Sequence, residues 1–108
     1  MYKYIIMKPD GVVSCETHKQ RFEYEEVRRI VGGLVQIVPY FSSLEYEGRK
    51  FNRGTAYANE EGWVHGLPHN PHATNAWIKA CPAGDPKRMD LAGTVLFVVK
   101  DKSDGKGS

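Results

Sequence analysis

The sequence predicts an α+β domain, a small mixed or antiparallel sheet of about five strands with two helices packed on one face. Short apolar runs rich in β-branched residues, each followed by a turn signal, predict the strands, and the clearest run spans 93–99. Segments 17–34 and 71–80 carry the start and stop signals of helices. The order of these elements along the chain favours two helices on one face of the sheet.

The first two strands are expected near the N-terminus. Residues 4–7 form a short apolar run, and the turn-forming residues Pro9, Asp10 and Gly11 follow it. Residues 12–13 are two valines that begin a return strand. This segment therefore predicts a buried strand, a turn and the start of a second strand.

The first helix is expected after Thr17, whose hydroxyl can cap the first backbone N–H groups. Gly32 and Gly33 end it, because glycine readily adopts the left-handed conformation that closes a helix. Apolar residues recur between these ends at three- and four-residue spacing, and the charged residues among them face water. The apolar positions are Tyr24, Val27, Ile30, Val31 and Leu34.

The middle of the chain predicts a strand and a hairpin. Residues 34–41 favour the pleated conformation, with Pro39 limiting the pairing near the end, and we expect this strand to be central in the sheet. Residues 44–46 and 54–58 are expected to be the arms of a hairpin around the polar loop 47–53.

The second helix is expected at 71–80, because Asn70 can cap it and Pro71 suits its first position. A loop and the strand at 93–99 follow. The polar tail 101–108 is rich in Gly and Lys, and we expect it to be disordered after a single domain that spans 1–100.

Composition narrows the classes of function. The chain has 108 residues, 41% of them hydrophobic, which is enough for one modest core. Fifteen Lys and Arg against 13 Asp and Glu leave a net charge of +2, and no basic helix is recognisable, so direct nucleic-acid binding is not favoured. Two isolated cysteines, the lack of a secretory signal and the lack of a long apolar run predict a cytoplasmic protein without a membrane span.

Most residues with chemical potential lie in the turn-rich segment 59–74. His65, His69 and His72 have a spacing that could offer three imidazoles to zinc, with Glu60, Glu61 or Cys81 as a fourth ligand. Glycines and prolines interrupt the segment, so no continuous helix aligns His65 with His69 on one face, and we expect no metal site. We expect no cofactor either.

Enzymatic activity is not expected. The tripeptide at 72–74, His-Ala-Thr, occurs in two-histidine phosphoesterases, but their acid-base mechanism needs the tripeptide twice and this chain has it once. No other nucleophile and base stand at a recognisable spacing. The sequence therefore favours a binding protein.

Four segments in order carry a resemblance to a known family. They are the Val-Gly-Gly run within 31–38, Asn-Glu-Glu-Gly at 59–62, the stretch 66–74 with Asn70, Ala73 and Thr74, and Leu-Ala-Gly-Thr-Val at 91–95. Together they resemble domain of unknown function 3846, which occurs largely in bacteriophages and bacterial mobile elements. One departure is Gln36, where the family pattern favours glutamate. The resemblance implies a small phage accessory protein that acts on a host component, and it implies no activity.

Two binding hypotheses follow. In the first, the protein sequesters or redirects a host macromolecule, most simply a host protein, through exposed aromatic anchors. Strand alternation sends Tyr40 and Phe41 to opposite faces, so at most one of them points into the core. Trp77 and Ile78 on the second helix are expected in the core. The candidate anchors are Tyr40, Phe41, Tyr46, Tyr57 and Trp63.

In the second hypothesis, segment 59–74 binds a small nucleotide, and the protein acts as a sponge for an immune signalling nucleotide. The start of the helix near Pro71 would present backbone N–H groups and the positive end of its dipole to phosphate. The candidate ligand-binding residues are Arg53, Asn59, Glu60, His69, Asn70, His72 and Thr74. A homodimer is compatible with both hypotheses, since the last strand or the hairpin could leave an open sheet edge.

Overall fold

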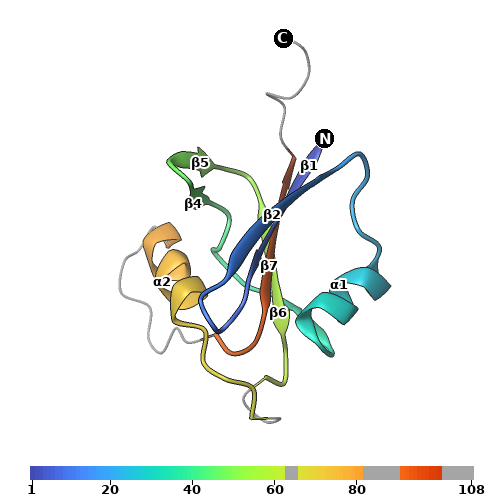
Figure 1. Ribbon diagram of the computed structural model, residues 1–108, viewed down its shortest axis with the longest axis vertical. Coiled ribbons are helices and arrows are strands. Elements are labelled where there is room, and N and C mark those ends of the chain that lie inside the picture. The colour runs from blue at the N-terminus through green and yellow to red at the C-terminus, as the bar shows by residue number, and fades with distance from the viewer. Residues whose placement is uncertain (63–65, 82–90, 101–108) are drawn as a thin grey trace.

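The computed structural model describes residues 1–62, 66–81 and 91–100, and it confirms the α+β class (Figure 1). A five-stranded antiparallel sheet has the order β2-β1-β7-β6-β3, and a separate two-stranded hairpin pairs β4 with β5. The strands are β1 (Tyr2–Met7), β2 (Val13–His18), β3 (Val35–Ile37), β4 (Leu44–Tyr46), β5 (Arg49–Phe51), β6 (Thr55–Asn59) and β7 (Val95–Lys100). The helices are α1 (Tyr24–Val31) and α2 (Pro71–Ala80).

The last strand of the sequence is the central strand of the sheet. Phe97 of β7 lies opposite Ile5 of β1 on one side and Ala56 of β6 on the other. Figure 1 shows β7 passing between β1 and β6. Five successive apolar residues of β7 are buried, because both faces of this strand are covered. The strand expected at 93–99 is thus confirmed, but it cannot supply an open sheet edge.

The two helices lie on opposite faces of the sheet, so the prediction of two helices on one face is wrong. Alternate residues of β1 and β7, including Ile5 and Phe97, pack in one cluster with α2 and the hairpin. The residues between them, including Tyr4 and Leu96, pack with Val27 of α1 in a second cluster. An uninterrupted apolar strand such as β7 needs cover on both sides, and one helix on each side supplies it.

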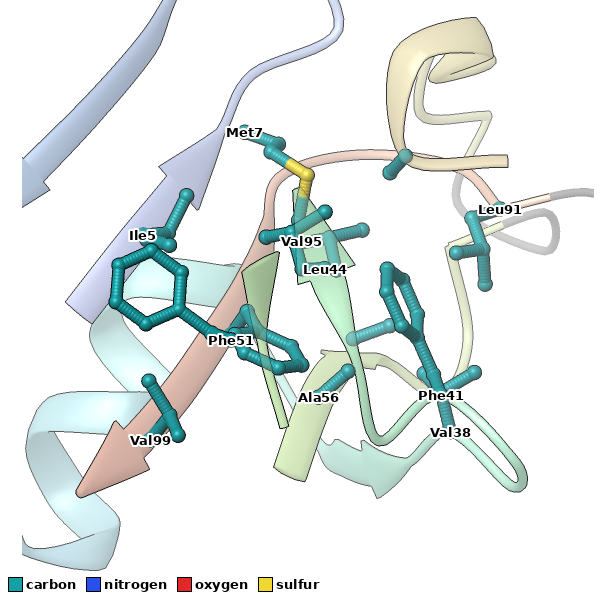
Figure 2. Packing of buried hydrophobic residues seen from close by; sticks show 13 residues of the cluster. Ile5, Met7, Val38, Phe41, Leu44, Phe51, Ala56, Leu91, Val95 and Val99 are labelled. Carbon is teal, nitrogen blue, oxygen red and sulfur yellow. The ribbon is translucent and has the colours of Figure 1, made fainter. Parts of the chain in front are cut away.

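The larger cluster joins the sheet to the hairpin. Figure 2 shows Ile5 and Val99 of the sheet beside Phe51, and Phe41 in the same layer. The Phe41 and Phe97 rings lie 5.7 Å apart between centroids. The hairpin therefore covers part of one face of the sheet and packs beside α2.

The hairpin itself differs from the prediction. Leu44 pairs with Phe51, so the second arm is 49–51, and the segment expected to be that arm, 54–58, belongs to the main sheet as part of β6. Glu47 and Gly48 form the two-residue connection, with φ of 52° and 81°. Positive φ at both positions is typical of the tight turn whose twist suits a hairpin.

The first helix is also shorter than predicted. It begins at Tyr24, with Glu23 at the cap position, while Thr17 belongs to β2 and pairs with Lys3 of β1. The Lys3 Nζ donates to the Thr17 hydroxyl over 2.9 Å. Gly32 ends the helix at a φ of 86°, as expected. The return strand expected to begin at 12–13 continues to His18. Pairing with β1 stabilises these residues as a strand, although the sequence predicts a helix after Thr17.

The strand expected to be central, 34–41, is instead the short edge strand β3, which pairs with β6. Val38 and Phe41 beyond it are buried in the core. Trp77 is half-buried, and its indole N–H donates to the Pro39 carbonyl over 2.7 Å. Ile78 is 43% exposed, so its expected place in the core is wrong. In the described ranges, no helix has the length and apolar character that spanning a membrane requires.

Candidate functional site

Asn59, the first candidate ligand of segment 59–74, has a structural role. Its buried side chain donates from Nδ2 to the Val31 carbonyl over 3.3 Å, and its Oδ1 accepts the Glu61 N–H over 2.8 Å. A Cβ atom at Gly33 would lie 2.8 Å from that Nδ2. Asn59 therefore fastens the end of β6 to the end of α1, and Gly33 makes room for it.

Asn70 is a buried three-way clamp. Its Nδ2 donates to the carbonyls of Met7 and Gly93, each over 2.9 Å, and its Oδ1 accepts the Ala73 N–H over 3.1 Å. The expected cap of α2 is confirmed, but both amide hydrogens are already used inside the protein. Asn70 has no N–H left to offer to a ligand.

The start of α2 is largely closed to an anion. Pro71 has no N–H, the Ala73 N–H is held by the Asn70 side chain, and the Thr74 N–H donates to the Asn70 carbonyl over 3.0 Å. Only the His72 N–H remains of the first four. Anion sites at helix starts depend on several N–H groups that point at the ligand together. The backbone here does not form such a cradle.

The remaining candidate ligands are not gathered around one point. The Thr74 hydroxyl accepts the Leu91 N–H over 2.9 Å and lies 3.4 Å from the His69 Nε2. Thr74 and His69 are therefore two candidate ligands whose side chains lie in contact. Glu60 follows β6 whereas Arg53 precedes it, which separates them by roughly 20 Å of extended chain. His72 is exposed on α2.

The histidine cluster considered for zinc is only partly within the described residues. His65 lies outside them, as does Trp63, one of the predicted aromatic anchors. Within residues 1–62, 66–81 and 91–100, no three His, Cys, Asp or Glu side chains are grouped so that they could hold a metal ion.

The other predicted anchors divide between surface and core. Tyr40 is 70% exposed and Phe41 is 1% exposed, so one of this pair points outward and Phe41 is wrong as an anchor. Tyr46 and Tyr57 are half-buried. Of these, Tyr57 lies in a groove that the sequence did not reveal.

This groove lies on the face of the sheet that carries α1. It has a volume of about 330 Å³. We call it the aromatic groove, and its lining residues are Arg21, Phe22, Tyr24, Val27, Val35 and Tyr57. It exists because α1, with only eight residues, leaves part of this face to the chain that leads into it.

Side-chain contacts fix the shape of the aromatic groove. The Phe22 ring stacks on the buried Tyr4 ring, with centroids 3.9 Å apart and planes 13° apart. The Tyr4 hydroxyl donates to the Gln20 carbonyl, which holds the segment before Phe22. Arg21 donates from Nη2 to the Tyr57 hydroxyl over 3.1 Å and so bridges that segment to β6. The wall of the groove is thus preorganised.

The rim of the groove carries both signs of charge. A neighbouring hollow of about 580 Å³ shares Arg21 and Phe22 with the aromatic groove. Its other lining residues are His18, Lys19, Gln20, Glu23, Glu25 and Glu26. His18 lies 2.9 Å from Glu16 and packs on Tyr4 and Phe22, with ring centroids 4.7 and 4.9 Å away. Apolar ring surface inside a polar, mixed-charge rim is typical of a protein-binding surface.

Chemically, the aromatic groove is suited to binding. Its six lining residues offer three aromatic rings, two valines and one guanidinium. Tyr24 is 56% exposed and lies at the rim of the groove. Its expected place on the buried apolar face of the first helix is therefore wrong.

Sequence reasoning missed this groove because it placed Arg21, Phe22 and Tyr24 inside one long helix. The signal that could have shown it is the run at 21–24, Arg-Phe-Glu-Tyr, which alternates aromatic and charged residues. Alternation of this kind is typical of extended chain, and aromatic residues and arginine are enriched in interface hot spots.

Comparison with known proteins gives no match to the chain among protein families, curated proteins or solved structures.

Proposed function

We propose that this protein is a non-enzymatic phage accessory protein that binds a host bacterial protein in the cytoplasm and modulates or inhibits it. We further propose that the aromatic groove is the docking surface. The resemblance to domain of unknown function 3846 supports the phage setting. The observation that supports binding is the preorganised groove itself, with Tyr24 exposed at its rim and Arg21 held against Tyr57.

Tyrosine and arginine are among the residues that contribute most to protein interfaces. A tyrosine side chain buries a large area while losing little conformational entropy, and its hydroxyl remains hydrogen-bonded. A groove of about 330 Å³ can receive one or two side chains of a partner. The small net charge of +2 suits a specific protein partner better than a nucleic acid.

The alternative, a sponge for a signalling nucleotide, has less support. Three of its candidate residues, Asn59, Asn70 and Thr74, are buried and bonded within the protein. The start of α2 offers one backbone N–H where a phosphate would need several.

Affinity purification of the tagged chain from a bacterial lysate tests the proposal, with mass spectrometry of co-purifying proteins and of small molecules released by denaturation. We expect one host protein at near-stoichiometric yield. Tyr24→Ala should reduce its recovery at least about tenfold, because a truncated interface hot spot weakens binding by that order. Ile78→Ala is the matched control, since it also shortens an exposed apolar helix residue but lies on α2, across the sheet.

Urea denaturation of both variants establishes that each is folded. Equal recovery of the partner with Tyr24→Ala and wild type would remove the aromatic groove as the docking surface. A released nucleotide without a protein partner would favour the sponge instead.

A further inference from the structure

The two outer strands of the main sheet differ in how they present themselves. β2 includes the charged residue Glu16, whose Oε1 lies 2.9 Å from the His18 Nε2, and a charged residue on an edge strand discourages pairing with other chains. The segment 34–40 around β3 has no charged residue. It exposes Leu34 by 44%, Ile37 by 63% and Tyr40 by 70%. β3 therefore lacks the protection that β2 has.

The backbone of β3 is oriented for further pairing. The Glu60 N–H donates to the Leu34 carbonyl over 2.8 Å, and the Val38 N–H donates to the Ala56 carbonyl over 2.9 Å. In an antiparallel ladder, bonded and non-bonded positions alternate, so 34, 36 and 38 face β6. The N–H and C=O groups of Val35 and Ile37 consequently point away from β6, toward the side where no described strand lies.

These four outward groups are symmetric about Gln36. Beyond them the edge closes, because Pro39 has no N–H and its carbonyl accepts the Trp77 indole N–H. At the other end, Gly32 and Gly33 turn into α1, and both of their N–H groups donate to the Arg28 carbonyl. The outer edge of β3 therefore offers only the N–H and C=O groups of Val35 and Ile37 for pairing with another strand.

From this symmetry we infer that β3 pairs with β3 of a second copy of this chain, antiparallel and about a two-fold axis at Gln36. Val35 then lies opposite the second copy's Ile37, and Ile37 opposite its Val35. Each of these two pairs exchanges both of its backbone hydrogen bonds, which gives four in all. Gln36 of one copy faces Gln36 of the other.

The chain itself supplies the residues that complement this edge. On one face β-branched residues meet β-branched residues, which pack well on a pleated surface, and on the other face an uncharged amide meets an amide. No like charges are brought together, because 34–40 has none. The exposed Ile37 side chain gains the partner's Val35 as a neighbour. A two-fold interface is self-complementary in this way, and two-fold dimers are the commonest oligomers.

The pairing joins two five-stranded sheets into one continuous sheet. Paired residues point to the same face, so both copies of α1 lie on the same side, and Val35 lines the aromatic groove of each copy. Two aromatic grooves then flank the two-fold axis. The inference rests on β3 alone and does not depend on the proposed host partner.

Sedimentation equilibrium of the purified chain over a range of concentrations tests the dimer. We expect an equilibrium between monomer and dimer in the wild type. Gln36→Lys and Gln36→Glu each place like charges opposite each other at the axis, and each should raise the dimer dissociation constant at least about tenfold. An equimolar mixture of the two variants places opposite charges there and should restore the association as a heterodimer.

Gln36 is exposed in the monomer, so neither variant threatens the fold. Ser14→Lys is the matched control, because it adds a charge at an exposed position of the other outer strand and should leave the dimer unchanged. A wild type that stays monomeric at every concentration overturns the inference. The edge of β3 would then be available only to a strand of a different protein. A dimer that tolerates Gln36→Lys, or variants that do not recover on mixing, overturns the pairing about Gln36.

Discussion

The side chain of Asn70 determines whether segment 59–74 is interpreted as a ligand site or as part of the framework. Its amide bonds to carbonyls of β1 and of the turn before β7 while its oxygen caps α2, so three parts of the fold meet at one buried group. No buried side-chain N or O atom of the described residues lacks a partner. A residue that looked like a ligand donor in the sequence is thus part of the framework.

We expect Asn70→Ala to lower the free energy of unfolding by about 3 kcal/mol, because it removes three buried hydrogen bonds that contribute about 1 kcal/mol each. Loss of a helix cap alone would cost about 1 kcal/mol. Urea denaturation measures the difference. His72→Ala, at an exposed neighbouring position, should change stability by no more than about 0.5 kcal/mol. A loss of about 1 kcal/mol or less in Asn70→Ala would mean that the clamp does no more than cap α2.

Tyr4 connects the fold to pH. Burial raises the pKa of its hydroxyl above the ordinary value of 10.0, since the phenolate would be poorly solvated. The folded protein therefore retains this proton at a pH where the unfolded chain loses it. The associated stability is fully present below pH 10.0 and is lost as pH rises through the raised pKa.

Urea denaturation at a series of alkaline pH values should show this decline in the wild type, and Tyr4→Phe should show a smaller one. The variant also loses the hydrogen bond to the Gln20 carbonyl, which should cost about 1 kcal/mol at neutral pH. The same alkaline decline in both proteins would exclude Tyr4 as its source.

At the scale of elements, the end of α1 depends on Gly32. Its φ of 86° is left-handed, and its N–H donates to the Arg28 carbonyl. A Cβ there would meet only the Asn59 Nδ2, at 3.9 Å, so the cost of substitution is conformational and not steric. We expect Gly32→Ala to cost about 1 kcal/mol in urea denaturation, and Gly32→Asn to cost less because asparagine tolerates this conformation. Equal losses in the two variants would contradict that explanation.

The elements that the sequence predicted well are those with local signals. Asn70 and Pro71 mark the start of α2, and Gly32 marks the end of α1, because caps and turns depend on neighbours in the chain. The sequence places a helix start at Thr17, whereas Thr17 and His18 pair with β1, a partner that lies outside any local window. The two-residue turn at Glu47 and Gly48 was read as part of a longer loop, since glutamate is unusual at positive φ.

At the scale of the whole molecule, the arrangement of layers was less predictable than the elements. The run 95–99 is apolar at every position, which indicates a strand buried on both faces, yet the predicted arrangement placed both helices on one face. The aromatic groove depends on that arrangement, because it forms where α1 leaves the sheet uncovered. Its residues come from the segment before α1, from α1 itself, from β3 and from β6, and no local pattern relates these four.

The central position of β7 has a consequence for synthesis on the ribosome. β1 and β6 are neighbours only through β7, so during translation the first 94 residues hold two half-sheets that lack their shared strand. Pairs such as Ile5 with Phe97 join the two extremes of the domain, and contacts of this kind form late because they close long loops. The sheet is therefore completed only after translation of β7, and until then the edges of β1 and β6 that β7 will cover are open to pairing with other chains.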